Sequence, residues 1–112
     1  MKTQGLVMIE PQKTGFLATI QTDRIVTDGT IHEIHQELQE YVNAHPGTVL
    51  HLDMSNVQRF SCAALPGLLD LQQALRETNG ALRLSGLRGN VRKCIRLTGM
   101  ENVFTLEHRH AH

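Results

Sequence analysis

The feature that most constrains the fold is the alternation of short apolar segments with longer segments of helical period. The short segments have the length and apolar content of strands, and they cover residues 5–9, 16–20, 48–54, 81–85 and 103–106. Apolar residues recur at helical spacing over residues 31–42, 65–75 and 91–97. Strands that alternate with helices favour a parallel sheet with right-handed crossovers. The sequence therefore predicts an α/β domain in which the first two strands form a hairpin and the order is β-β-α-β-α-β-α-β.

Turn and capping residues predict where these segments begin and end. Pro11 is expected to end the first strand, and the Lys-Thr-Gly turn of residues 13–15 leads into the second. The Thr-Ile-His-Glu sequence of residues 30–33 fits a capping box at the start of the first helix. Residues 43–47 are expected to stop that helix, and Asn79 with Gly80 to stop the second.

Length and composition predict one domain that functions in solution. The 112 residues are 40% apolar and 20% charged, with a net charge of zero, so we expect no nucleic-acid partner. No apolar run approaches the roughly 18 residues that span a bilayer, and the first residues lack the apolar stretch of a signal peptide. We expect a single domain over residues 1–112 without membrane insertion, with a polar tail at about residues 107–112.

Two cysteines are too few for a disulfide framework, and they favour a reduced, cytoplasmic protein. Cys94 falls on the apolar side of the third predicted helix and is expected in the core. Cys62 precedes the second predicted helix, where a small, partly buried residue is the plainer interpretation. A thiol-based sensor is the alternative, because a helix start lowers the pKa of a thiol.

The histidines raise the question of a metal site. His32 and His35 have a spacing that can chelate a metal, but we expect both on the polar side of the first helix, without clustered carboxylates. His108, His110 and His112 alternate in the polar tail and are interpreted as incidental. We predict no metal and no cofactor. Because no acid–base pair or oriented nucleophile is visible, we also predict no enzymatic activity and no catalytic residue.

A glycine-containing loop at residues 86–90 precedes the third predicted helix. A phosphate could bind at such a helix start, but the Walker Lys-Ser/Thr pair and the G-x-G-x-x-G spacing are missing. A strand-to-helix turn capped by Asn90 is therefore preferred. Four basic residues lie in this loop and helix: Arg88, Arg92, Lys93 and Arg96. They form either a solvated face or a patch that meets an acidic partner.

Three segments carry motifs of a known family. Residues 52–57 (LDMSNV) resemble the strand end "LDLSGV", and residues 79–84 (NGALRL) resemble the strand entry "GGRLxL". Residues 91–104 (VRKCIRLTGMENVF) resemble "VRRVLELTGLDxLF". These motifs are similar to those of the STAS family, the fold of bacterial anti-sigma-factor antagonists. The resemblance implies a single, mostly parallel sheet with helices packed on one side.

The resemblance also implies docking in place of catalysis. In the sigma-regulating branch, the domain binds an anti-sigma factor that is an ATP-using serine kinase. Phosphorylation of a serine at the start of the second helix releases the partner. We therefore expect a bacterial, cytoplasmic regulator of transcription that binds a protein. A STAS subunit bound to the ATPase of an ABC-type lipid transporter is the alternative.

At the family's acceptor motif this sequence differs. The motif "DSSGLG" aligns with residues 61–66 (SCAALP), which places Cys62 at the acceptor serine, so no phosphorylation switch is expected there. Ser61 could be a displaced acceptor, but capping the second helix is the preferred role. Pro66 disfavours helix at Leu65, so the helix begins near Leu65 or has a distorted first turn.

The expected partner surface comprises the strand-to-helix loop, the helix start and two neighbouring arginines. Its residues are Asn56, Ser61, Cys62, Ala63, Leu65, Arg88 and Arg92. Asp53, at the end of its strand, is either a functional residue or an anchor of the loop that accepts hydrogen bonds from amides of residues 55–57.

Overall fold

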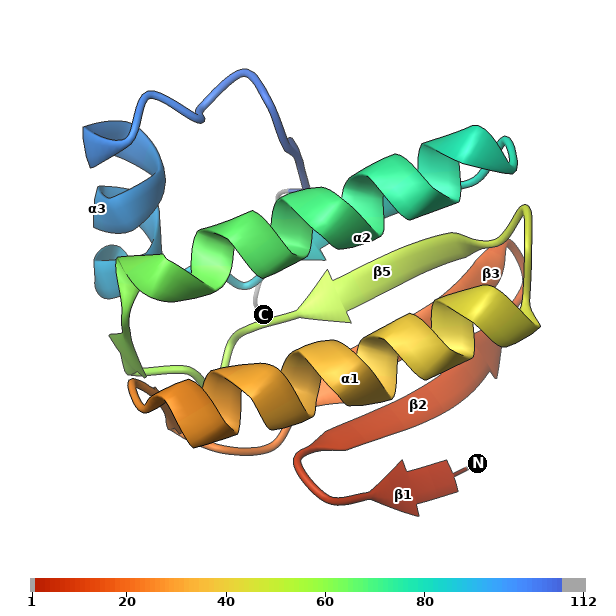
Figure 1. The fold of residues 1–112 in the computed structure, drawn as a ribbon, viewed down its shortest axis with the longest axis horizontal. Coiled ribbons are helices and arrows are strands. Elements are labelled where there is room, and N and C mark those ends of the chain that lie inside the picture. The colour runs from red at the N-terminus through yellow and green to blue at the C-terminus, as the bar shows by residue number, and fades with distance from the viewer. Residues whose placement is uncertain (1, 108–112) are drawn as a thin grey trace.

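The computed structural model describes residues 2–107, which form a six-stranded sheet with helices across one face (Figure 1). In spatial order the strands are β1 (Lys2–Gln4), β2 (Val7–Gln12), β3 (Gly15–Ile20), β5 (Val49–Asp53), β7 (Ala81–Ser85) and β8 (Thr105–Glu107). β3, β5, β7 and β8 pair in parallel, whereas β1 and β2 are antiparallel additions. The predicted α/β class, its mostly parallel sheet and its N-terminal hairpin are confirmed.

Two long helices cover the sheet and a third lies apart from them (Figure 1). α1 (Asp28–Ala44) and α2 (Leu65–Glu77) lie side by side on one face. α3 (Gly89–Leu97) lies beyond the carboxyl end of β5 and contacts β6 (Arg59–Phe60). β6 forms a small parallel sheet with β4 (Arg24–Ile25), and the one-turn 3₁₀ helix η1 (Cys62–Ala64) leads into α2. In the part of the chain described, no helix has the length and apolarity needed to cross a membrane.

Period-two alternation in the central strands creates the core. Leu50 and Leu52 of β5 are in register with Leu82 and Leu84 of β7, and all four are at most 2% exposed. The residues between them point to the other face, where His51 is half-buried and Arg83 is exposed. The two long helices cover the buried face with apolar residues at helical spacing: Ile34, Leu38, Val42, Leu68, Leu71 and Leu75. Burying each such side chain stabilises the fold by about 1.5–3 kcal/mol before entropy is counted.

The expectation that Pro11 ends the first strand is wrong. Pro11 lies inside β2 and is in register with Phe16 of β3. Proline is tolerated there because β1 pairs with β2 only at residues 7–9. At Pro11, β2 is therefore an edge strand, and the missing amide proton breaks no ladder hydrogen bond on that side.

The predicted capping box at residues 30–33 is also wrong. α1 begins at Asp28, and its N-cap is Thr27, whose hydroxyl accepts a hydrogen bond from the Thr30 amide at 3.2 Å. Thr30 therefore lies in the first turn. The same Ser/Thr preference at helix starts operates here, three residues earlier in the chain.

Candidate partner-binding surface

The loop after β5 is held to two neighbouring elements. Asp53 Oδ1 accepts a hydrogen bond from the Ser55 amide at 2.9 Å, which confirms the predicted anchoring role of Asp53. Asn56 Nδ2 donates to the Ile20 carbonyl at 3.1 Å, and Arg88 Nε donates to the Ser55 carbonyl at 2.7 Å. The loop is thus fixed between β3 and the approach to α3.

Gly86 allows the β7–α3 loop to approach this segment closely. Its φ is +68°, and a Cβ there would lie 2.8 Å from both Asp53 Oδ1 and the Ser55 nitrogen. A side chain would therefore meet both backbone strain and a steric clash. The shape of the loop depends on glycine at this position.

Ser61 caps η1. Its hydroxyl accepts a hydrogen bond from the Ala63 amide at 3.2 Å, and its own amide donates to the Ile25 carbonyl at 2.7 Å. The expectation that Ser61 caps the second helix is wrong, because the N-cap of α2 is Ala64, which makes no side-chain cap, and Ser61 caps the short 3₁₀ helix that precedes α2. The hydroxyl is engaged in this cap and the residue is half-buried.

Pro66 determines where α2 begins. The helix starts at Leu65 and places Pro66 in its first turn, where a missing amide proton breaks no helical bond. The prediction that the helix begins near Leu65 is confirmed. Leu65 itself is 1% exposed and packs in the core, so it supports the surface from beneath and is not part of it.

Cys62 and Cys94 are joined by a disulfide between residues 32 positions apart. The expectation of two reduced cysteines without a bond is wrong in this structure. Their Cα atoms are 5.3 Å apart, because η1 packs against α3. Cys94 is 6% exposed, which confirms its predicted place in the core, whereas the expectation that Cys62 is partly buried is wrong, since Cys62 is exposed.

Asn90 does not cap α3, contrary to expectation. The N-cap position is Arg88, and Asn90 Nδ2 donates to the Gln58 carbonyl at 2.6 Å. Arg92 Nε donates to the Leu87 carbonyl at 3.1 Å. The polar groups at the start of α3 thus bind neighbouring loop carbonyls, which fixes α3 against the segment that leads into η1.

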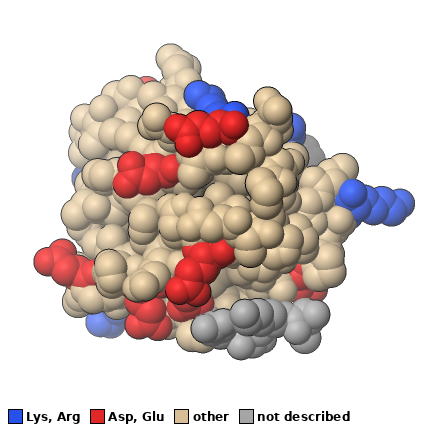
Figure 2. Space-filling model, turned by 45° about the vertical axis from the view of Figure 1, so that its right-hand side comes forward, with Lys and Arg blue, Asp and Glu red and all other residues tan. Residues whose placement is uncertain are grey.

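Charge is unevenly distributed along the chain. No Lys or Arg occurs between Arg24 and Arg59, and no Asp or Glu occurs between Glu77 and Glu101. The second interval contains Arg83, Arg88, Arg92, Lys93 and Arg96. On the face shown in Figure 2, acidic side chains predominate over basic ones. Arg24 and Arg59, in register on β4 and β6, add basic groups near α3.

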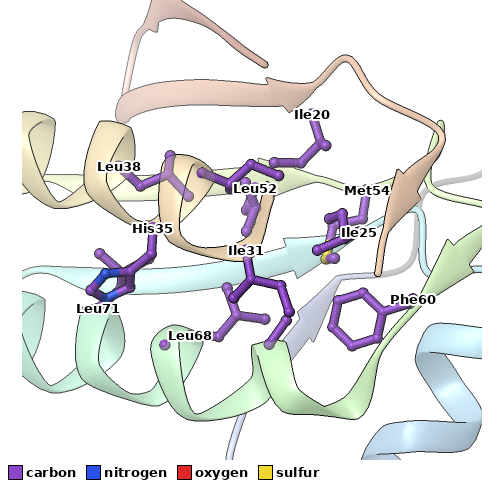
Figure 3. A pocket seen from close by; sticks show the side chains of 13 residues that line it. Ile20, Ile25, Ile31, His35, Leu38, Leu52, Met54, Phe60, Leu68 and Leu71 are labelled. Carbon is purple, nitrogen blue, oxygen red and sulfur yellow. The ribbon is translucent and has the colours of Figure 1, made fainter. Parts of the chain in front are cut away.

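His35 does not lie on the polar side of α1 as expected. It lines a cavity of about 30 Å³ between α1, α2 and the sheet, and its Nε2 is buried without a hydrogen-bond partner (Figure 3). A Cβ on Gly67 would lie 2.9 Å from His35 Cδ2. Apolar side chains form the rest of the lining, among them Ile20, Ile31, Leu38, Leu52, Met54 and Phe60. This volume is enough for a water molecule and too small for a substrate.

Metal-binding groups are dispersed over the described residues. His32 is exposed, and no cluster of three or more His, Cys, Asp or Glu residues occurs within residues 2–107. The tail histidines His108, His110 and His112 lie outside the described residues.

Comparison with known proteins assigns the family. A family model described as "Mlab, STAS domain" matches residues 20–107. The chain belongs to the STAS family. A STAS domain protein from Planctomyces limnophilus, described as an anti-sigma-factor antagonist, has a TM-score of 0.78 at 11% identity, covering 94% of this chain and 91% of that chain. An anti-sigma factor antagonist from Mycobacterium paratuberculosis has a TM-score of 0.76 at 21% identity, covering 89% and 82%.

At these identities the structural likeness establishes the STAS fold alone. A search of curated protein sequences found no significant match. At the start of η1, where the STAS motif has its acceptor serine, this chain has Cys62, which is bonded in the disulfide.

Proposed function

We propose that this STAS domain is a non-catalytic docking module that binds an anti-sigma factor with serine-kinase activity and thereby regulates transcription in a bacterium. The observation that carries the proposal is the exposed surface at the start of η1 and α2, whose backbone is anchored by hydrogen bonds. Asn56, Cys62 and Ala63 are exposed on it, while the adjoining backbone is anchored by side-chain hydrogen bonds. A surface that is ordered before binding loses little conformational entropy when a partner docks.

The charges beside this surface favour an acidic partner face. Arg88 and Arg92 are exposed, and their bonds to the Ser55 and Leu87 carbonyls use one nitrogen of each guanidinium. The remaining N–H groups can donate to carboxylates of the partner. Such groups contribute mainly to orientation and to the rate of association.

Phosphorylation does not control this interaction in our proposal. The acceptor position holds Cys62, which has no hydroxyl, and the neighbouring Ser61 hydroxyl is occupied in the η1 cap. The protein therefore competes with other ligands of its partner according to its abundance. We place it in the cytoplasm, where the sigma-regulating partners of the family act.

Affinity capture from a native lysate, with partners identified by mass, tests the proposal. We expect a sigma-binding kinase to be retained by the wild-type chain. Ala63→Glu should lose that partner, because it adds bulk and charge to the exposed face of η1. Gln73→Glu is the matched control, since Gln73 is exposed farther along α2 and should retain binding. Equal capture by both variants, or transfer of phosphate from the kinase to Ser61, would contradict the proposal.

The second candidate function is a STAS subunit that binds the ATPase of an ABC-type lipid transporter. It is favoured by the description of the matching family model, "Mlab", which differs from the anti-sigma names of the structural neighbours. The same capture experiment separates the two functions. Retention of a Walker-motif ATPase that binds no sigma factor would support the transporter role and reject the regulatory one.

A further inference from the structure

We infer that Cys62 and Cys94 form a reversible oxidation site whose closure fixes the proposed docking surface. The effect on partner binding rests on the proposed function, whereas the oxidation site itself is inferred from the geometry of the two cysteines. The disulfide joins the first residue of η1 to the middle of α3. These two elements carry Ala63 and Arg92, both exposed, on the proposed surface.

The two cysteines differ in access. Cys62 is exposed, whereas Cys94 is 6% exposed and its Sγ lies 3.9 Å from the Phe60 carbonyl oxygen. An oxidant in solution therefore reaches Cys62 first. Cys94 is placed to attack the oxidised Cys62 sulfur from within the protein and so to close the disulfide. An accessible cysteine beside a resolving cysteine is the arrangement that supports reversible thiol chemistry.

A small disulfide such as glutathione disulfide serves as the oxidant. The Cys62 thiolate attacks one of its sulfurs, a protein–glutathione S–S bond forms, and one glutathione leaves as its thiolate. The Cys94 thiolate then attacks the Cys62 sulfur, which forms the internal disulfide and expels the second glutathione. Overall the two protein thiols lose two electrons and two protons, and one glutathione disulfide becomes two glutathione molecules.

Closure matters because η1 is short. It contains three residues. Outside the disulfide, its start is held by the Ser61 cap and by the hydrogen bond from the Ser61 amide to the Ile25 carbonyl, and its end is held by Ala64, which packs in the core. The covalent link to α3 removes alternative positions of η1. The oxidised protein therefore presents the surface in its binding shape, and reduction lowers affinity for the partner by about tenfold, within the usual range of coupling between sites.

The chemistry is tested on the isolated full-length chain in a glutathione redox buffer, with mass spectrometry as the readout. We expect the wild type to lose two hydrogens. Cys94→Ser should accumulate one glutathione on Cys62, while Cys62→Ser should remain largely unmodified because Cys94 is buried. Cys94→Ala repeats the measurement in case a buried serine disturbs packing. Equal modification of the Cys62→Ser and Cys94→Ser chains, or a wild type that stays dithiol under oxidising conditions, would overturn the inference.

Hydrogen exchange tests the structural consequence. Reduction should speed exchange of the amides of residues 61–65 by about tenfold or more, because local opening of η1 becomes easier. Amides of α1 between Ile34 and Val42 serve as the internal control and should change little. Unchanged exchange over residues 61–65 would show that closure does not fix the surface. Both experiments use the isolated chain, so a negative result in either does not contradict the docking proposal. Conversely, a capture experiment that retains no partner does not contradict the oxidation site.

Discussion

Reduction of the disulfide should lower the stability of the native state substantially. The bond closes a loop between residues 32 positions apart. For a loop of this length, the chain-entropy model gives a loss of about 12.5 cal/mol/K in the unfolded chain, or about 3.7 kcal/mol at 25 °C. Unfolding entropy near 60 °C is roughly 235 cal/mol/K for 112 residues, so the melting temperature should fall by about 16 °C on reduction.

Thermal and urea unfolding of the oxidised and reduced chain measure this difference. Mass spectrometry of alkylated samples confirms the redox state before each experiment. The dependence of unfolding free energy on urea should be steeper for the reduced chain, because its unfolded state exposes more surface. The Cys62→Ser, Cys94→Ser double variant is the control, and it should match the reduced wild type under both redox conditions.

Coincident melting temperatures for the oxidised and reduced wild type would refute this reasoning. If reduction lowers the melting temperature by less than this and leaves the urea dependence of the unfolding free energy unchanged, the effect lies in native-state packing at Cys94 and not in the unfolded chain.

Four further substitutions, one of them a control, test the packing and the electrostatics. Gly86→Ala should destabilise the fold by at least about 1–2 kcal/mol in urea unfolding, because Gly86 has a φ of +68° and abuts the β5 loop. Gly89→Ala, where a Cβ meets nothing within 4 Å, should be close to neutral, and an equal loss at both positions would refute the strain argument. Leu71→Ala should cost about 2.7–5 kcal/mol because Leu71 is 0% exposed, and a loss below about 1 kcal/mol would contradict its place in the core. Burial raises the pKa of Glu37 above its ordinary value of 4.5, against the opposing hydrogen bond from the Leu6 amide. The native state thus holds that proton more tightly than the unfolded chain, so the contribution of Glu37 to stability is present below pH 4.5 and is lost as the pH rises through the folded pKa. The stability of Glu37→Gln relative to wild type should therefore increase between about pH 4 and pH 7. A decrease in its relative stability over that range would show that folding lowers the pKa of Glu37 and does not raise it.

Local chemistry determined much of this protein. Period-two alternation predicts β7 with its observed bounds, Ala81–Ser85, because a strand with one buried face must alternate. Pro66 predicts the start of α2 because proline lacks the amide proton that a helix interior needs. Asp53 anchors the following loop through a bond that spans two residues, which local sequence is enough to predict.

Contacts between distant residues decided what remained. β4 and β6 have two residues each and no strand signal of their own, and they exist because they pair with each other. His35 faces the interior because α2 packs beside α1, and helical period alone cannot distinguish a solvent-facing side from one facing a second helix. Cys62 and Cys94 meet because η1 packs on α3 across 32 residues of chain, a distance that no sequence spacing encodes. The sequence by itself thus determined the main helices, the central strands and the family resemblance, because these depend on local period and capping. Tertiary packing alone decided the pairing of β4 with β6 and the disulfide between η1 and α3, because both join segments that are distant in the chain.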